Sequence, residues 1–258
     1  MTSATVVTET WFSPALDRAK RVNILLPSGY ASGARSYPVL FLLHGYGGNR
    51  DTWLRNASSL AELDLIVVCP ESGRRWFIND HAGHRYEDYL VRELVDRVDA
   101  HYRTTQRRGI AGFSMGGAAA VFQALRHPDV FNAAASLAGA FGAPLRLGDP
   151  YAAFRDDPTL LMPTVESHEL VWGPPGSPTR HAYSPETLLD RYVPGLGLDL
   201  QVGTGDYARV VRMNRDMRMA MERRRVPHSY AEVPGAHDWD FVNRALPSAL
   251  TFLQGCLS

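Results

Sequence analysis

The sequence has very little lysine and very little cysteine. Its 258 residues include one lysine, Lys20, and two cysteines, Cys69 and Cys256. A single lysine disfavours Schiff-base chemistry, and no G-K-[ST] phosphate-binding loop can be written with it. Two cysteines far apart, with no ligand pattern around them, exclude a disulfide framework and a zinc ribbon. We therefore expect two free cysteines and no cofactor.

The chain also lacks net charge and long hydrophobic runs. Lys plus Arg and Asp plus Glu both number 27, so we expect neither nucleic acid nor an anionic membrane as a partner. The longest apolar run, residues 39–43, is too short to cross a bilayer, and residues 1–30 show no signal-peptide pattern. The sequence thus predicts a soluble, cytoplasmic protein with a small-molecule partner. It leaves the oligomeric state open.

Short apolar runs alternate along the chain with longer segments of helical periodicity. This alternation predicts an α/β fold: one domain over residues 1–258, with a mostly parallel central sheet and helices on both faces. The predicted strands are 5–12, 22–26, 39–43, 65–69, 109–113, 131–137, 198–202 and 228–233. The predicted helices are 86–102, 116–126, 209–225 and 241–253.

Residues 140–195 interrupt this alternation, because they hold nine of the 17 prolines. So much proline excludes a central strand or a long helix. We expect a cap-like insertion that starts near the active site and carries more apolar residues than a solvated loop needs. Either these residues pack the segment onto the sheet, or some of them line the substrate pocket. The pocket candidates are Phe154, Leu161, Met162 and Trp172.

The sequence Gly-Phe-Ser-Met-Gly at 112–116 matches G-x-S-x-G, the nucleophile elbow. A predicted strand precedes it and a predicted helix follows it, which is the context that the motif requires. Small residues allow the sharp turn, and Ser114 is then exposed at the carboxyl edge of the sheet. The alternative, a structural serine in a glycine-rich turn, is disfavoured by this context. We expect Ser114 to be a catalytic nucleophile.

The sequence His-Gly-Tyr-Gly-Gly at 44–48 directly follows a predicted strand. Acyl transfer needs two backbone N–H donors for the oxyanion, one after the nucleophile and one from an early loop. These positions correspond to Met115 and Tyr46. His44 could be catalytic, but we favour a structural role in which its ring supports the loop.

A base and an acid must complete such a site. In this fold the chain order is Ser, then Asp or Glu, then His, with the histidine after the last strand. His237 follows the strand predicted at 228–233, and Asp206 follows the strand predicted at 198–202. We expect His237 to move the proton and Asp206 to fix its tautomer. The less favourably placed acids are Asp190, Asp199 and Asp238.

The loop Asp-His-Ala-Gly-His at 80–84 could offer three metal ligands. Its spacing matches no established site geometry, and neither Cys nor Glu supports it. We expect a polar loop and no metal site. The surrounding segment 71–85 follows the carboxyl end of a strand, so we expect it to border the active site.

Together these motifs resemble the putative-esterase branch of the α/β-hydrolases, which includes S-formylglutathione hydrolases, feruloyl esterases and mycolyltransferases. The resemblance covers about residues 20–255, except for the proline-rich segment. It implies a triad of Ser114, Asp206 and His237, with Tyr46 and Met115 as oxyanion donors. The matching segments are YPVLFLLHGYGG (37–48), YEDYL (86–90), AGFSMGG (111–117), RHPDVF (126–131), GTGD (203–206) and PGAHDW (234–239).

Three functions fit these motifs. The first is a serine carboxylesterase that hydrolyses small to medium acyl esters through an acyl-enzyme. The second is an acyltransferase, in which an alcohol or amine replaces water at the same acyl-enzyme. The third is a binding protein that keeps the fold without turnover, which the presence of all three triad residues disfavours.

Overall fold

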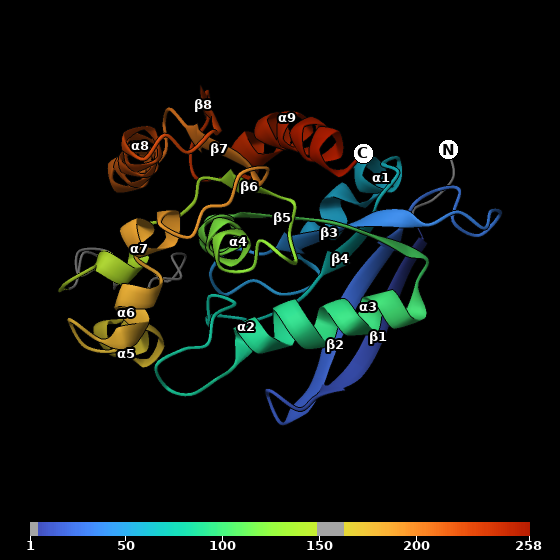
Figure 1. Ribbon diagram of the computed structural model, residues 1–258, viewed down its shortest axis with the longest axis horizontal. Coiled ribbons are helices and arrows are strands. Elements are labelled where there is room, and N and C mark those ends of the chain that lie inside the picture. Colours follow the sequence, from blue (N-terminus) through green and yellow to red (C-terminus); the bar gives the residue numbers. More distant parts are fainter. Residues whose placement is uncertain (1–4, 149–162) are drawn as a thin grey trace.

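An eight-stranded sheet forms the centre of the molecule (Figure 1). The structure is a computed structural model that describes residues 5–148 and 163–258. The strand order is β1-β2-β4-β3-β5-β6-β7-β8, and among these strands only β2 runs against the others. The strands are β1 Thr5–Ser13, β2 Arg18–Leu26, β3 Tyr37–Leu43, β4 Ile66–Cys69, β5 Thr104–Phe113, β6 Ala133–Leu137, β7 Gly197–Gly203 and β8 Ser229–Val233.

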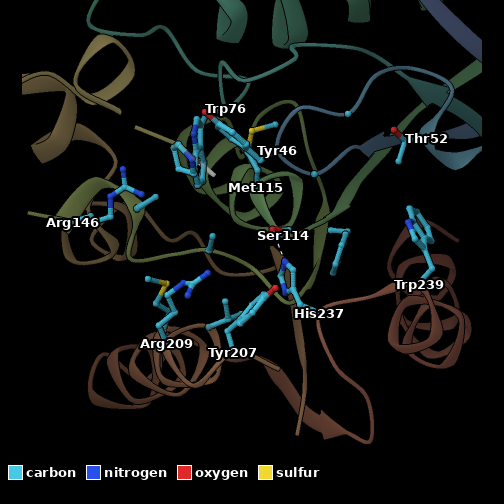
Figure 2. A pocket seen from close by; sticks show the side chains of 18 of the residues that line it. Tyr46, Thr52, Trp76, Ser114, Met115, Arg146, Tyr207, Arg209, His237 and Trp239 are labelled. Carbon is cyan, nitrogen blue, oxygen red and sulfur yellow. Dashed lines mark hydrogen bonds between the residues drawn. The ribbon is translucent and has the colours of Figure 1, made fainter. Parts of the chain in front are cut away.

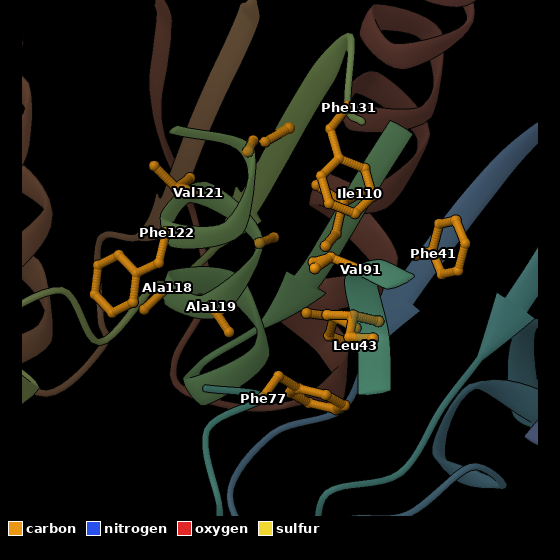
Figure 3. Packing of buried hydrophobic residues seen from close by; sticks show 14 of the residues in the cluster. Phe41, Leu43, Phe77, Val91, Ile110, Ala118, Ala119, Val121, Phe122 and Phe131 are labelled. Atoms are coloured by element: carbon orange, nitrogen blue, oxygen red, sulfur yellow. The ribbon is translucent and has the colours of Figure 1, made fainter. Parts of the chain in front are cut away.

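Helices cover both faces of the sheet. Successive strand residues point to opposite faces, so Phe41 and Leu43 of β3 pack with α4 (Figure 3), whereas Leu40 and Leu42 pack with α9. The apolar run in β3 is continuous because both faces are buried. Outside the proline-rich segment, the longest helices are α4 Met115–Arg126, α8 Ala208–Arg223 and α9 Trp239–Leu257. The shorter ones are α1 Ala57–Ala61, α2 Tyr86–Asp88, α3 Val95–His101, the 3-10 turn η1 Thr52–Asn56 and the π-helical turn η2 Tyr89–Leu94.

The predicted α/β fold with a mostly parallel sheet is confirmed. β2 and β5 start earlier than expected, because their first residues pair in ladders while remaining largely polar, which hides them from an apolar pattern. The helix expected at 86–102 is present as α2, η2 and α3 in succession. Both cysteines are free, as expected. None of the helices in the described ranges is long and apolar enough to cross a membrane.

The described part of the proline-rich segment forms four short helical turns, as its proline content requires. The prolines of α6 and α7 occupy the first helical turn, where no backbone N–H is needed, and a serine caps each helix. These turns lie beside α4 (Figure 1), with Trp172 and Tyr183 packed into the core. They are η3 Ala143–Leu145, α5 Val165–Trp172, α6 Pro178–Ala182 and α7 Pro185–Leu189.

A buried carboxylate joins this segment to the rest of the fold. Glu87 is 3% exposed and accepts hydrogen bonds from Arg126 at 3.0 Å, His127 at 2.8 Å and the hydroxyl of Tyr183. Burial opposes the charge of Glu87, but the bonds from His127 and Arg126 outweigh it and lower the pKa to about 2. One carboxylate thus connects α2, the end of α4 and the segment after α6.

We predict that Glu87→Gln lowers the free energy of unfolding at pH 7 by about 3 kcal/mol, because it leaves Arg126 without its carboxylate partner. The stabilisation by Glu87 is fully present above the unfolded pKa near 4.5 and is lost as the pH falls toward 2. Urea unfolding should therefore show a difference between wild type and variant that shrinks from pH 5 to pH 3. The exposed Glu62→Gln serves as a control, and an equal effect there would contradict the prediction.

Candidate active site

Ser114 lies on a turn between β5 and α4 that has almost no free space. Its φ is +57°, a conformation that non-glycine residues rarely adopt, and its N–H donates to the carbonyl of Leu137 at 2.8 Å. A Cβ on Gly112 would lie 2.5 Å from the carbonyl carbon of Gly116, and one on Gly116 would lie 2.4 Å from the oxygen of Leu43. The two glycines of the motif are therefore required by the close approach of three backbone segments.

The structure brings Ser114, His237 and Asp206 into one hydrogen-bonded row. Nε2 of His237 lies 2.9 Å from Oγ of Ser114 (Figure 2), and Nδ1 lies 2.8 Å from Oδ2 of Asp206. The Asp206 side chain is fully shielded from solvent, and its Oδ1 accepts the N–H of Tyr207 at 2.6 Å. The three residues follow β5, β8 and β7, whose carboxyl ends meet at one edge of the sheet.

The three other candidate acids have different partners. Asp190 pairs with Arg224 on the surface. Asp199 lies inside β7, where Gln201 donates to it, and Asp238 accepts the N–H of Phe241 as the N-cap of α9. In the described ranges none of these three carboxylates is hydrogen-bonded to His237. Of these four carboxylates, Asp206 is the one hydrogen-bonded to His237.

Two backbone N–H groups at the cavity wall are suited to an oxyanion. The amides of Gly47 and Gly48 donate to carbonyls of Gly73 and Gly45 at 3.0 Å. Within residues 5–148 and 163–258, by contrast, the amides of Tyr46 and Met115 have no protein acceptor. Both residues border the same cavity as Ser114. The sequence predicted oxyanion donors at these two positions, and that role remains a prediction.

The side chain of His44 supports the loop that carries Tyr46 through two hydrogen bonds. Its ring is fully buried, and burial lowers its pKa to about 4, so the ring is neutral near pH 7. Nε2 accepts the N–H of Ser72 at 3.0 Å, which leaves the proton on Nδ1 to be donated to the carbonyl of Gly45 at 2.7 Å. That carbonyl belongs to the peptide unit whose N–H is on Tyr46. The favoured structural role of His44 agrees with these contacts.

The loop that holds His44 is itself anchored by an ion cluster. Glu71 precedes Ser72 and is bound by Lys20 at 3.4 Å and by Arg50 at 3.0 Å. The side chains of Lys20 and Arg50 are only 10% and 14% exposed. The single lysine of the chain therefore helps to fix the segment that carries the hydrogen bond to His44.

A cavity of about 450 Å³ surrounds Ser114 (Figure 2). Thr52 and Trp239 lie on one side of the Ser114–His237 pair, and Arg146 and Arg209 lie on the other. Five aromatic side chains contribute to the walls: Tyr46, Trp76, Phe113, Tyr207 and Trp239. Such walls suit the apolar part of an organic ester.

The pocket prediction for Trp172 is wrong. Trp172 is completely buried and packs edge-on against Trp76 at 5.2 Å, and it is Trp76 that borders the cavity. Phe154, Leu161 and Met162 lie outside the described residues. The described proline-rich segment contributes four lining residues: Ala140, Ala143, Arg146 and Pro163. Burial of Trp172 in the core explains the difference, because an indole in a short loop helix can serve packing as well as binding.

The sequence did not single out Trp76, Tyr207 or Trp239. Tyr207 directly follows Asp206, and Trp239 stands two residues after His237, so proximity to the predicted triad was an available signal. Trp76 lies in the segment 71–85, which was expected to border the site. The φ of Trp76 is +58°, an unusual backbone conformation that no sequence pattern predicts.

The loop considered as a metal site makes protein contacts. Asp80 accepts the backbone N–H of His84 at 2.9 Å and pairs with Arg75 at 3.2 Å. In the part of the chain that the structure describes, no group of three or more His, Cys, Asp or Glu residues could hold a metal ion.

A parallel sheet with a serine on a strand-to-helix turn, and with histidine and aspartate on later loops, defines an α/β-hydrolase. The chain belongs to the family described as Putative esterase, whose model matches residues 13–253.

Curated relatives of the chain are named as esterases. An esterase of Mycobacterium tuberculosis is 28% identical over 241 residues, which are 84% of this chain and 52% of the relative. An acetyl esterase of Caldicellulosiruptor saccharolyticus is 24% identical over 237 residues, 84% of this chain and 83% of the relative. The chain thus spans about half the length of the mycobacterial protein.

Solved structures share the fold along the whole chain. A fluorophosphonate-binding serine hydrolase of Staphylococcus aureus has a TM-score of 0.82 at 24% identity, covering 98% of this chain and 99% of that one. An S-formylglutathione hydrolase of the same organism has a TM-score of 0.78 at 24% identity, with the same coverage.

The geometry predicts that Asp206→Asn leaves the fold intact but places the His237 proton on the wrong nitrogen. Ester hydrolysis should fall by roughly 10⁴ in kcat, as in other serine triads. Steady-state kinetics on a p-nitrophenyl ester measures this, with Asp190→Asn and Asp199→Asn as matched controls. A mild effect of Asp206→Asn beside a severe effect of either control would overturn the assignment.

We also predict that Glu71→Gln lowers kcat by about tenfold while KM changes little. Loss of an oxyanion donor costs about 10²–10³ in kcat, and a loosened loop should cost less than that. Inhibition by a boronic acid, which mimics the tetrahedral state, should weaken in parallel with kcat. Unchanged boronate inhibition with a lowered melting temperature would show that Glu71 supports stability alone.

Proposed function

We propose that the protein is a serine carboxylesterase that hydrolyses small to medium acyl esters through an acyl-enzyme. The observation that carries the proposal is the row Ser114–His237–Asp206, with distances of 2.9 and 2.8 Å, at the wall of an aromatic cavity. Membership in the esterase family and the names of the relatives support the same chemistry.

In the first half-reaction, Oγ of Ser114 attacks the ester carbonyl carbon while Nε2 of His237 takes the hydroxyl proton. Asp206 holds the Nδ1–H and stabilises the imidazolium that forms. The carbonyl oxygen becomes an oxyanion, and the N–H groups of Tyr46 and Met115 donate to it. The ester C–O bond then breaks, and His237 returns the proton to the departing alcohol.

In the second half-reaction, water attacks the acyl carbon and gives its proton to Nε2 of His237. The bond to Oγ of Ser114 breaks, the carboxylic acid leaves, and the proton returns to Oγ. An acyltransferase would carry out the same steps with an alcohol or amine in place of water. Product analysis with added alcohols separates the two, because a transferase forms the new ester in preference to the acid.

Other expectations from the sequence stay predictions. They are a cytoplasmic location, the absence of a nucleic-acid or membrane partner, and the role of the proline-rich segment as a cap. A cavity of about 450 Å³ is the basis for proposing esters of small to medium size.

We predict that Ser114→Ala folds normally and loses ester hydrolysis by several orders of magnitude, because no other group can form the acyl-enzyme. A fluorophosphonate probe should label the wild type on a peptide containing Ser114 and should not label the variant. Ser58→Ala, at an exposed position, is the control and should keep both properties. Substantial hydrolysis by purified, folded Ser114→Ala would exclude the proposed nucleophile.

A further inference from the structure

Among the described residues that line the cavity, the fixed charges are all of one sign. Its described lining includes three arginines, Arg55, Arg146 and Arg209, and neither aspartate nor glutamate. The chain as a whole has equal numbers of acidic and basic residues, so this excess is local. Asp206, the carboxylate beside His237, is fully shielded from solvent. A group of negative charge therefore meets only attractive fixed charges from the described wall.

Arg55 is the arginine whose surroundings define a binding position. Its guanidinium lies 4.0 Å from the ring centre of Trp239, and its Nε donates to the carbonyl of Thr52 at 3.2 Å. Trp239 is held in turn by the buried Trp53, edge-on at 5.2 Å. These contacts orient the exposed side chain and leave its terminal NH₂ groups as donors. Arg55 forms no ion pair with a carboxylate in the described ranges.

Thr52 adds a second donor on the same side of the cavity. Its Oγ accepts the N–H of Asn49 at 3.1 Å, so its hydroxyl proton remains available to a ligand. A Cβ on Gly48 would lie 2.9 Å from this Oγ, and the glycine therefore permits the hydroxyl to sit against the oxyanion loop. A hydroxyl and a guanidinium one helical turn apart form a donor pair suited to a carboxylate.

The arginines on the opposite side of the cavity are engaged in other contacts. Arg146 and Arg209 lie across the Ser114–His237 pair from Trp239 (Figure 2), and both also take part in other interactions. Arg209 stacks on Tyr207 at 4.6 Å. The position of an anion is therefore argued from Arg55 and Thr52.

We propose that the ester cleaved by this protein carries a carboxylate, and that this carboxylate binds Arg55 and the hydroxyl of Thr52 at the side of the cavity formed with Trp239. The inference rests on the proposed esterase function and specifies its substrate class. The reacting carbonyl lies at Ser114, and the charged end of the substrate extends toward η1. Neutral esters of equal shape bind the same walls without this contact.

Two pairs of esters test the proposal. The first pair places the carboxylate in the acyl part of the substrate, and the second places it in the alcohol part. The first pair is the 4-nitrophenyl monoester of adipic acid and 4-nitrophenyl 6-methylheptanoate, which differ in a carboxylate and an isopropyl end of equal shape. The second pair is 4-carboxyphenyl acetate and 4-isopropylphenyl acetate. In at least one pair, kcat/KM should favour the anionic ester by about tenfold at low salt, and the preference should shrink as salt is added.

Single arginine-to-glutamine variants show which arginine causes the preference for anionic esters. Arg55→Gln should lower kcat/KM for the preferred anionic ester by about tenfold more than it lowers kcat/KM for the neutral partner. Arg74→Gln is the matched control, because Arg74 also stacks on an aromatic ring near the site, 5.7 Å from Tyr46, but does not line the cavity. Arg146→Gln removes one charge from the opposite side. Both should keep the preference.

The outcomes are distinct. Cleavage of both members of each pair at equal rates overturns the anionic substrate, and a preference that survives Arg55→Gln overturns the placement of its carboxylate at Arg55. A preference lost in Arg146→Gln but kept in Arg55→Gln overturns its placement. Failure to cleave any of the four esters, together with no fluorophosphonate labelling of Ser114, is a failure of the proposed function itself.

Discussion

The close packing of three backbone segments around Ser114 is the constraint on which the site depends. The end of β3, the turn at Ser114 and the first turn of α4 approach so closely that two glycine positions have no room for a Cβ. This contact places the loop after β3 directly beside the serine. Tyr46 and Met115, the proposed oxyanion donors, are therefore neighbours in space although 69 positions separate them in sequence. The same backbone contacts therefore position both Ser114 and the loop after β3.

Buried polar groups then hold that arrangement in place. His44 is neutral and uses both ring nitrogens to join the loop after β3 to the loop after β4. Behind it, Glu71 with Lys20 and Arg50 anchors the second loop. Hydrogen bonds in a buried site are electrostatically stronger than in water and polarise one another, so these residues support one another. The ion cluster lies away from the substrate, yet it fixes the peptide that carries the Tyr46 N–H.

The sequence was sufficient for the fold and for the row Ser114–His237–Asp206, because strand order and strand ends determine where such loops meet. Its failures have physical causes. Trp172 looked like a pocket residue since composition cannot separate a buried aromatic from an exposed one. Trp76 was not singled out, because its orientation depends on a left-handed backbone conformation. Arg55 reaches the cavity through stacking on Trp239, a contact between distant segments that has no local pattern.

The edge-on pair of Trp76 and Trp172 has a consequence for how selectivity can change. Trp76 forms part of the cavity wall, but its position is set by Trp172 at 5.2 Å and, behind that, by Tyr183 at 5.9 Å. Trp172 of α5 and Tyr183, which follows α6, thus position part of the cavity wall, although neither of them borders the cavity. Divergence in this outer layer can reshape the cavity between relatives while every residue that meets the ester stays the same.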